Sequence, residues 1–286
     1  MSEEKKNLQL KLNKVIQNLG QINYTINEDD VLIQILQNKR NFQNFYSNYK
    51  TLIKNLSKYV KIQMELKYKL KKIKFLSSNN EYFWGSSSLE TTASNQITKL
   101  LIIINDPLNY PGVFSKIKMC FNSIKEGSIF QFLEIAENKN YKVIVLNISK
   151  VKDNNKDIDS YLQNFWKLFI QNQLKYLNNI IILSHNNSSI PLIKLLNKNQ
   201  RDFEEKIKKI ILINSKHNEF YKIMEKNIQE TFSKKTTNYI LSNESIGNLI
   251  YSSLTSFDGC ENRSSGTINE DECHLNVIKE LENLLI

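Results

Sequence analysis

The sequence predicts an α/β protein with a mostly parallel central sheet, helices on both sheet faces and an N-terminal helical layer. From Lys99 onwards, short continuous runs of apolar, largely β-branched residues recur at 100–104, 143–146, 180–183 and 210–213. Such runs are typical of parallel strands that are covered on both faces. The intervals of roughly 30 to 40 residues between most of them leave room for a crossover helix each time.

Residues 1–74 are expected to form a basic, mainly helical N-terminal region. No glycine or proline occurs between Gly20 and Gly85, which favours long helices, and apolar residues recur with a helical period over 41–72. Residues 1–80 contain fifteen Lys and Arg against six Asp and Glu, and so carry +9 of the net charge of +10.

Four lysines fall on the polar face of this predicted helix: Lys50, Lys54, Lys58 and Lys61. We favour the simpler interpretation, in which they form a solvated face. The sharper hypothesis is a stripe that contacts RNA phosphates or an acidic partner.

Residues 75–98 are rich in serine, asparagine and threonine and are predicted to be a loop or linker. Residues 99–286 then form the α/β domain, with helical periodicity over 117–136 and 158–176. We expect the three regions to pack as one unit.

Composition excludes several classes of protein. The 286 residues are 41% hydrophobic and 24% charged, as in a globular protein and unlike a disordered chain. No run approaches the roughly 20 apolar residues of a membrane span, and the N-terminus lacks the apolar core of a secretory signal. Three distant cysteines favour a reducing compartment, so we expect a soluble intracellular protein.

The third predicted strand runs into residues 184–189 (SHNNSS) and then into an apolar helical segment. This strand–turn–helix resembles the G-x-S-x-G nucleophile elbow of an α/β-hydrolase, which predicts an α/β-hydrolase-like sheet. Asn186 stands at the serine position, and Ser188 and Ser189 stand where glycine would relieve strain. An amide cannot act as the activated nucleophile, so the sequence predicts an enzyme scaffold without its chemistry.

The remaining triad positions follow from the chain order serine, acid, histidine. Asn214 follows the fourth strand at the acid position, and His274 lies in a late stretch at the position of the base. We predict a late loop there, in which His274 is either a triad relic or a solvent-exposed residue.

Polar residues after the first, third and fourth strands suggest a vestigial pocket: Asn105, Asp106, His185 and His217. The simpler interpretation of the two histidines, which we favour, is that they are buried and bonded to neighbouring groups. A zinc site of Cys260, Cys273, His274 and an acid is an alternative that we do not favour, because structural zinc sites use closely paired ligands. We therefore predict no metal and no cofactor.

Six segments of the sequence resemble motifs of one protein family and occur in the same order as in that family. Residues 19–27 resemble L-x-G-F-G-Y-x-F-N, residues 141–147 resemble Y-G-V-I-V-L-N, and residues 179–196 align with N-V-F-F-V-A-H-S-Y-G-G and the helix after it. The other three are the helix at 49–73, residues 214–218 (compare D-S-V-H-N) and residues 264–267 (compare S-A-G-T). Together they resemble the Argonaute-binding (Arb2) domain family, most closely its cotranscriptional-regulator branch.

The resemblance implies a hydrolase-like fold in which the family's serine and acid have become Asn186 and Asn214. The paired glycines have become Ser188 and Ser189, and the H-G-S-G oxyanion loop has become residues 105–108. Loss of the nucleophile alone typically removes about a million-fold in rate, so we expect no hydrolysis.

The resemblance also implies a function. We expect a non-catalytic scaffold or binding subunit of a small-RNA-directed silencing complex, with Argonaute or an RNA-dependent RNA polymerase assembly as partner. We also expect weak contact with RNA and no association with a membrane. We expect the protein in the nucleus rather than in the cytoplasm. Two alternatives stay open: a divergent serine hydrolase that uses Ser184, Ser188 or Ser189, and a pseudo-hydrolase whose pocket binds a small ligand.

Overall fold

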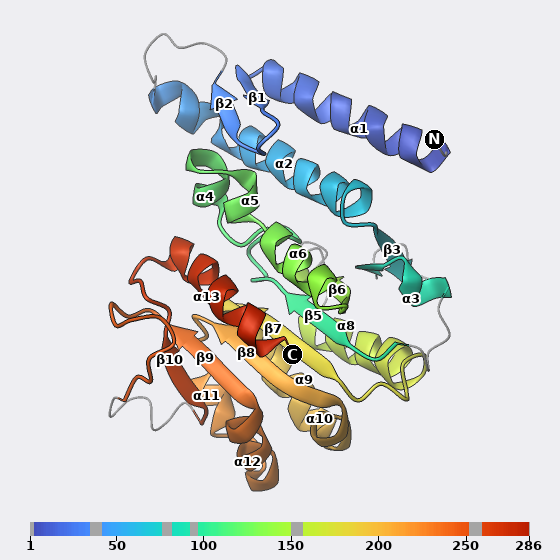
Figure 1. The fold of residues 1–286 in the computed structure, drawn as a ribbon, viewed down its shortest axis with the longest axis vertical. Coiled ribbons are helices and arrows are strands. Elements are labelled where there is room, and N and C mark those ends of the chain that lie inside the picture. The colour runs from blue at the N-terminus through green and yellow to red at the C-terminus, as the bar shows by residue number, and fades with distance from the viewer. Residues whose placement is uncertain are drawn as a thin grey trace.

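The computed structural model describes residues 3–34, 42–75, 82–91, 97–149, 157–251 and 259–285. Within these ranges an eight-stranded sheet has the order β10-β9-β8-β7-β5-β6-β4-β3 (Figure 1). Its strands are β3 (Leu70–Lys74), β4 (Tyr82–Ser86), β5 (Leu100–Ile104), β6 (Lys142–Leu146), β7 (Ile180–His185), β8 (Ile207–Ile213), β9 (Thr236–Ile240) and β10 (Glu261–Ser264). All neighbouring strands from β6 to β10 are parallel, whereas β4 is antiparallel to both β3 and β6. The predicted fold class is confirmed.

The central strands β5 to β8 are largely apolar because both sheet faces are covered. Every residue of β5 is buried. Successive side chains of a strand point to opposite faces, and accordingly Leu101 and Ile103 enter one hydrophobic cluster while Leu100, Ile102 and Ile104 enter the other.

Two groups of helices cover these faces. One face packs against α4 (Lys116–Phe121), α5 (Ile124–Gly127), α6 (Phe130–Asn138) and α13 (Glu270–Leu284). The other packs against α8 (Ile158–Phe165), the π-helix η2 (Trp166–Gln171), α9 (Ser189–Lys198), α10 (Gln200–Lys206), α11 (Asn218–Tyr221) and α12 (Lys226–Lys235). The predicted helical stretch 117–136 is thus divided among α4, α5 and the start of α6.

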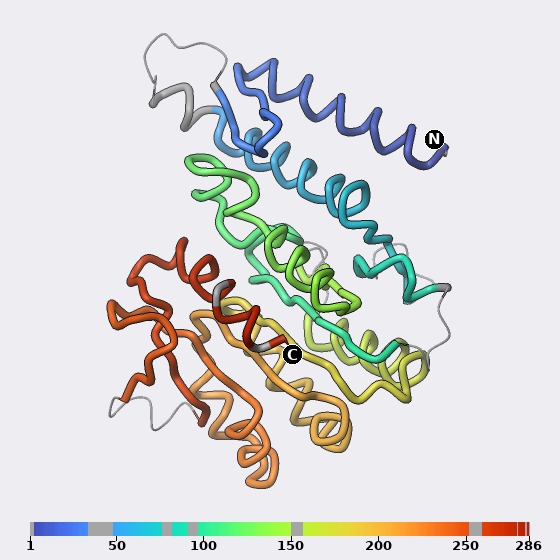
Figure 2. Tube along the Cα trace, viewed as in Figure 1, coloured from blue at the N-terminus to red at the C-terminus, as the bar shows by residue number. Residues whose placement is uncertain are grey.

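The N-terminal layer consists of α1 (Glu3–Gly20), α2 (Phe42–Leu66) and a hairpin of β1 (Tyr24–Ile26) and β2 (Leu32–Gln34). Figure 2 traces it at one end of the molecule, outside α4, α5 and α6. Helix α1 buries Leu8, Leu12, Val15 and Leu19 at helical spacing. The last three of these belong to the same hydrophobic cluster as one face of the sheet. None of the described helices is long and apolar enough to cross a bilayer.

The predicted linker at 75–98 is wrong for residues 82–91. They form β4, which pairs with β3 and β6 inside the sheet, and α3 (Ser88–Thr91). Residues 76–81 and 92–96 lie outside the described part of the chain. Turn-forming residues on both sides concealed a strand that is stabilised by non-local pairing and by the burial of Phe83 and Trp84.

Candidate functional site

The strand register brings the predicted site residues to one edge of the sheet. The connections of β5 and β7 run in opposite directions along the sheet, which makes their carboxyl ends the switch point where ligands bind in open α/β folds. Ile104 of β5 pairs with Ser184 of β7, and His185 pairs with Ile213 of β8. The residues after these strands, among them Asp106, Asn186 and Asn214, are therefore neighbours.

The turn after β7 has the backbone conformation that an elbow requires. Asn186 has a φ of +51° and Asn214 a φ of +50°, in the left-handed region that asparagine tolerates better than most residues. The Ser188 hydroxyl accepts a hydrogen bond from the His185 N–H (3.0 Å) and lies 2.9 Å from the Ile104 carbonyl. Ser188 is fully buried, so it holds the turn to β5 where the glycine of a hydrolase elbow would stand.

The two residues that the sequence predicts at the serine and acid positions, Asn186 and Asn214, are hydrogen-bonded to each other. Asn214 Nδ2 donates to Asn186 Oδ1 at 3.2 Å and also lies 3.3 Å from Glu270 Oε1 at the start of α13. Neither amide can accept a proton as a catalytic base would. The pair closes the end of the sheet with a neutral hydrogen bond.

If Asn186 stands at the serine position as predicted, Asp106 lies where a hydrolase would stabilise its oxyanion. One donor of an oxyanion hole is the backbone N–H of the residue after the nucleophile, which here is Asn187. That N–H donates to Asp106 Oδ2 at 3.3 Å, and Asn187 Nδ2 donates to the same oxygen at 3.0 Å. The other carboxylate oxygen accepts from the Leu108 N–H at 2.7 Å. A buried carboxylate thus takes the position where negative charge would develop, which opposes the electrostatic stabilisation that acyl transfer needs.

Sequence reasoning missed Asn187. The available signal was the acidic residue in the loop after β5, since a buried carboxylate requires nearby N–H donors. Asn105 is likewise satisfied within its own loop, because Nδ2 donates to the Val113 carbonyl (3.1 Å) and Oδ1 accepts from the Gly112 N–H (3.2 Å).

The prediction of a loop position for His274 is wrong. His274 lies in the first turns of α13 and is fully buried, so the solvent-exposed interpretation fails as well. Its Nε2 is 2.7 Å from the Glu126 carbonyl, and must therefore carry the proton and donate. Its Nδ1 is buried without a hydrogen-bond partner in the described part of the chain. Burial lowers the pKa of His274 to about 4.

Within the described residues, no hydrogen bond joins His274 to Asn186 or Asn214. The ring packs beside Phe114 at a centroid distance of 5.2 Å and beside His185 at 6.2 Å. His185 is buried too, and burial lowers its pKa to about 3. The two imidazoles therefore form a neutral buried pair beneath the elbow.

His217 does not join this pair. It is fully buried and packs against Phe232, which belongs to the cluster on the other sheet face, while Phe114 belongs to the first. Two residues of the predicted pocket lie near the elbow: Asp106, which is hydrogen-bonded to Asn187, and His185, which packs against Phe114. His217 lies on the other face of the sheet.

The four predicted lysines are not equivalent. Lys50, Lys54 and Lys58 are exposed along α2, as expected for a polar face. Lys61 is partly buried, and its ammonium lies 5.1 Å from the centre of the Tyr110 ring. Only the first three form an exposed stripe.

An open groove of about 610 Å³ lies beside the elbow, lined by residues 106–108, 157–159 and 190–191 together with Asn187 and Lys194. Its lining includes the apolar residues Leu108, Ile158 and Ile190, and Lys194 is paired with Asp159 at 2.7 Å. In the described ranges, no group of three or more His, Cys, Asp or Glu side chains is placed to hold a metal ion. The cysteines of the zinc alternative have separate neighbours, His217 for Cys260 and the Tyr239 carbonyl for Cys273.

Comparison with known proteins agrees with this architecture. A histone deacetylase from Saccharomyces cerevisiae shares the fold with a TM-score of 0.55 and 10% identity, over 82% of this chain and 97% of that chain. The histone deacetylase Clr3 does so with a TM-score of 0.51 and 14% identity, over 82% of this chain and 39% of that chain. No curated protein sequence matches significantly.

At these identities the structural likeness shows the fold alone. The sequence, however, matches the family model of the Arb2 domain over residues 16–152 and 149–246, which is most of its length. The chain therefore belongs to the Arb2 domain family.

Proposed function

We propose that this Arb2 domain protein is a non-catalytic binding or scaffold subunit of a small-RNA-directed silencing complex. Membership of the family connects the chain with Argonaute-associated chromatin silencing. An Argonaute protein or an RNA-dependent RNA polymerase assembly is the proposed partner, and the nucleus is the proposed compartment.

The observation that carries the non-catalytic part is the contact between Asp106 and Asn187. A hydrolase with a replaced nucleophile could still keep a working oxyanion hole. Here the N–H that would stabilise the oxyanion is bonded to a carboxylate of the protein itself. Acyl transfer requires a nucleophile, an acid, a correctly placed base and a free oxyanion donor. None of these four is present at the predicted positions among the described residues.

The serine-hydrolase alternative finds little support at the elbow. Ser184 and Ser188 are fully buried and lie within hydrogen-bond distance of each other at 2.7 Å. The Ser189 hydroxyl donates to the Asn186 carbonyl at 3.0 Å. Across the described residues, none of these hydroxyls bonds to a histidine side chain that could act as a base.

The ligand-binding alternative rests on the groove beside Asp106. Its volume suits a small molecule, and a ligand that binds the folded state would raise the melting temperature. A metabolite panel that shifts the melting temperature of the wild type, but not of a Leu108→Glu variant, would favour this alternative over the scaffold.

The proposal is tested by purifying the tagged protein from its own cells after nuclease treatment and identifying its partners by mass spectrometry. We expect Argonaute or polymerase silencing subunits in near-equal amounts to the tagged chain. Recovery of the chain without such subunits would contradict the scaffold function.

A matched pair of surface variants would locate the partner. Leu108 in the strand-end loop and Ile223 after α11 are exposed to similar extents, 63% and 71%. Exposed apolar side chains near a concave surface are common binding anchors. We expect Leu108→Glu to release the partner and Ile223→Glu to retain it, with both variants keeping the wild-type melting temperature.

A further inference from the structure

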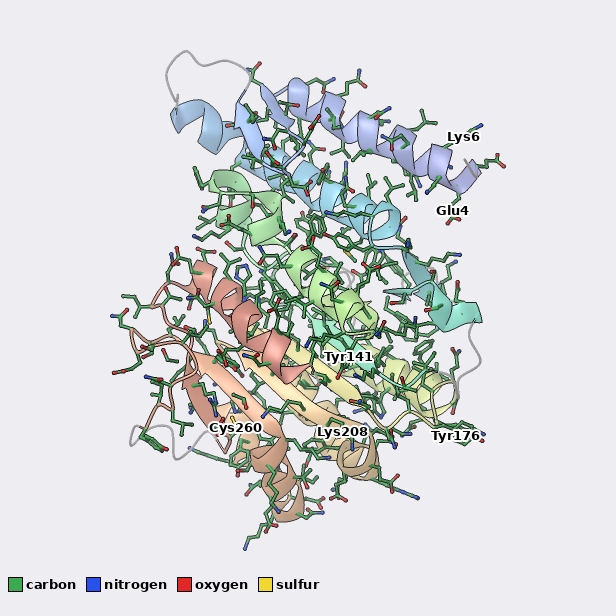
Figure 3. The ribbon with its side chains drawn as sticks, in the orientation of Figure 1. Glu4, Lys6, Tyr141, Tyr176, Lys208 and Cys260 are labelled. Carbon is green, nitrogen blue, oxygen red and sulfur yellow. The ribbon has the colours of Figure 1, made fainter. Side chains whose placement is uncertain are left out.

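We propose that Cys260, His217 and Ser215 form a reactive-thiol site at which the Cys260 sulfur is modified by electrophiles and oxidised by hydroperoxides. The site lies on the β10 side of the sheet, at the opposite end of the molecule from α1, and Figure 3 labels Cys260 there. It is separate from the elbow and independent of the proposed scaffold function.

The three side chains have the arrangement of a nucleophile, a base and a group that orients the base. Cys260 Sγ lies 3.7 Å from His217 Nε2, and His217 Nδ1 lies 2.8 Å from Ser215 Oγ. The imidazole is fully buried and packs on Phe232 at a centroid distance of 5.6 Å. Its orientation toward the sulfur is therefore fixed by packing and by Ser215.

Either imidazole tautomer favours the thiolate. If Nδ1 carries the proton, it donates to Ser215 and leaves Nε2 to take the thiol proton. If Nε2 carries the proton, it donates a hydrogen bond to the deprotonated sulfur. The thiolate is the reactive form of cysteine, so both arrangements raise the reactivity of Cys260.

The charged groups near the Cys260 sulfur either favour its thiolate form or are paired with a group of opposite charge. Lys209 of β8 interacts electrostatically with Cys260 and contributes positive charge, and Tyr221 of α11 is a neutral neighbour. On β10, Glu261 follows Cys260 directly but is paired with Arg263 at 2.5 Å. Among the described residues, His217 thus supplies a nitrogen base and Lys209 a positive charge, and the carboxylate of Glu261 is paired with Arg263.

The two other cysteines provide internal controls. Burial raises the pKa of Cys120 to about 12 and that of Cys273 to about 11. Cys273 belongs to α13 and is fully buried, with its sulfur 3.8 Å from the Tyr239 carbonyl. Cys260 is partly exposed at the start of β10, so an incoming reagent can reach it.

With a hydroperoxide, the Cys260 thiolate attacks the terminal, hydroxyl-bearing oxygen of the peroxide. An S–O bond forms while the O–O bond breaks, so the sulfur is oxidised by two electrons and the peroxide is reduced. The leaving oxygen takes the proton that His217 Nε2 accepted from the thiol and departs as water or an alcohol, which returns the imidazole to its neutral form. The product is a sulfenic acid, which thiols can reverse.

The test is residue-specific alkylation of the full-length native protein with iodoacetamide, followed by mass spectrometry of the three cysteine peptides. An ordinary thiol becomes about 25-fold more reactive between pH 7 and pH 9, because its thiolate fraction rises by that factor. We expect the rate at Cys260 to rise less than about threefold over this range. Hydrogen peroxide followed by dimedone should then label Cys260 and leave Cys120 and Cys273 unlabelled.

Two variants separate activation from mere exposure. His217→Gln removes the base and Ser215→Ala removes the group that orients it, and each should restore a steep rise between pH 7 and pH 9 at Cys260. A wild-type Cys260 that itself rises about 25-fold would overturn the proposal, whether or not the variants fold. So would dimedone labelling that is equal at all three cysteines.

Discussion

In the turn after β7, Asn186 has two roles: its backbone adopts the left-handed conformation, and its side chain forms a hydrogen bond. Asn186 accepts the left-handed backbone at φ +51° and its side chain bonds to Asn214. Ser188 then fills the space above β5 with a buried hydroxyl. These side chains form a connected set of hydrogen bonds, so we expect that a single substitution at Asn186 would not create hydrolase activity.

This reconstruction predicts the outcome of an attempted rescue. In the double variant Asn186→Ser, Asn214→Asp, a hydroxyl and a carboxylate return, but Asp106 still holds the Asn187 N–H and His274 Nε2 still donates to Glu126. We expect no labelling by a serine-directed fluorophosphonate and no ester hydrolysis above the wild type. Labelling at position 186 would show that the histidine and the oxyanion donor remain available.

The buried pair of histidines makes stability depend on pH. Burial lowers the pKa of His185 to about 3 and that of His274 to about 4, both below the unfolded value of about 6.5. The unfolded chain therefore binds protons first as the pH falls. The stabilisation is fully present above about pH 6.5 and is lost toward pH 4 and then pH 3.

Urea unfolding between pH 7 and pH 5 measures this effect. We expect the free energy of unfolding to fall by roughly 2 to 3 kcal/mol per pH unit near pH 5, about half from each histidine. A His274→Gln variant should show about half that slope. A wild-type profile that is flat over this range would contradict the neutral buried pair.

The residues of the elbow could be predicted from the sequence, but the contacts between them could not. Asn105, Asp106, Asn186 and Asn214 were identifiable because they follow apolar strands, and strand ends are local features. The contact of Asp106 with Asn187 spans 81 positions and depends on the pairing of β5 with β7. His274 was misplaced because the acidic residues before it, which begin α13, lie next to a loop rich in serine.

Among the helices and strands, α2 has the surface for which we state the most specific hypothesis, a stripe of lysines that contacts RNA. Lys50, Lys54 and Lys58 lie on successive turns and are exposed, whereas Lys61 is turned to Tyr110. Ion contacts of exposed lysines contribute little to folding stability, so these three can be replaced without unfolding the helix.

If the stripe contacts RNA, reversal of these three charges to glutamate should abolish binding of single-stranded RNA in a low-salt gel shift, because contacts with the nucleic-acid backbone are electrostatic. A matched control reverses Lys198, Lys226 and Lys234, which are exposed on the α9–α12 side of the molecule. Equal binding by the wild type and both triple variants would exclude an RNA-contacting stripe on α2.

The elements themselves were predicted unequally. Strands β5 to β8 were predictable because a parallel strand that is covered on both faces contains a continuous apolar run. β4 and β10 were not, since β4 lies between turn-forming residues and β10 (Glu261–Ser264) is polar in sequence. Both become strands through pairing with distant neighbours, which periodicity cannot show.

At the scale of the whole molecule, the N-terminal layer and the sheet share one hydrophobic cluster. Helices α1 and α2 therefore use their apolar faces within the chain and present polar faces outward. Within the described part of the chain, the surfaces that we propose for a partner are the strand-end loops and the exposed side of α2.

The most direct test of the scaffold account is the size of the native assembly. A cell extract is treated with nucleases, separated by gel filtration and probed for this chain. The account predicts elution well above the chain mass of 33.6 kDa, together with Argonaute or polymerase silencing subunits. Elution at the mass of the single chain, with those subunits in other fractions, would contradict it.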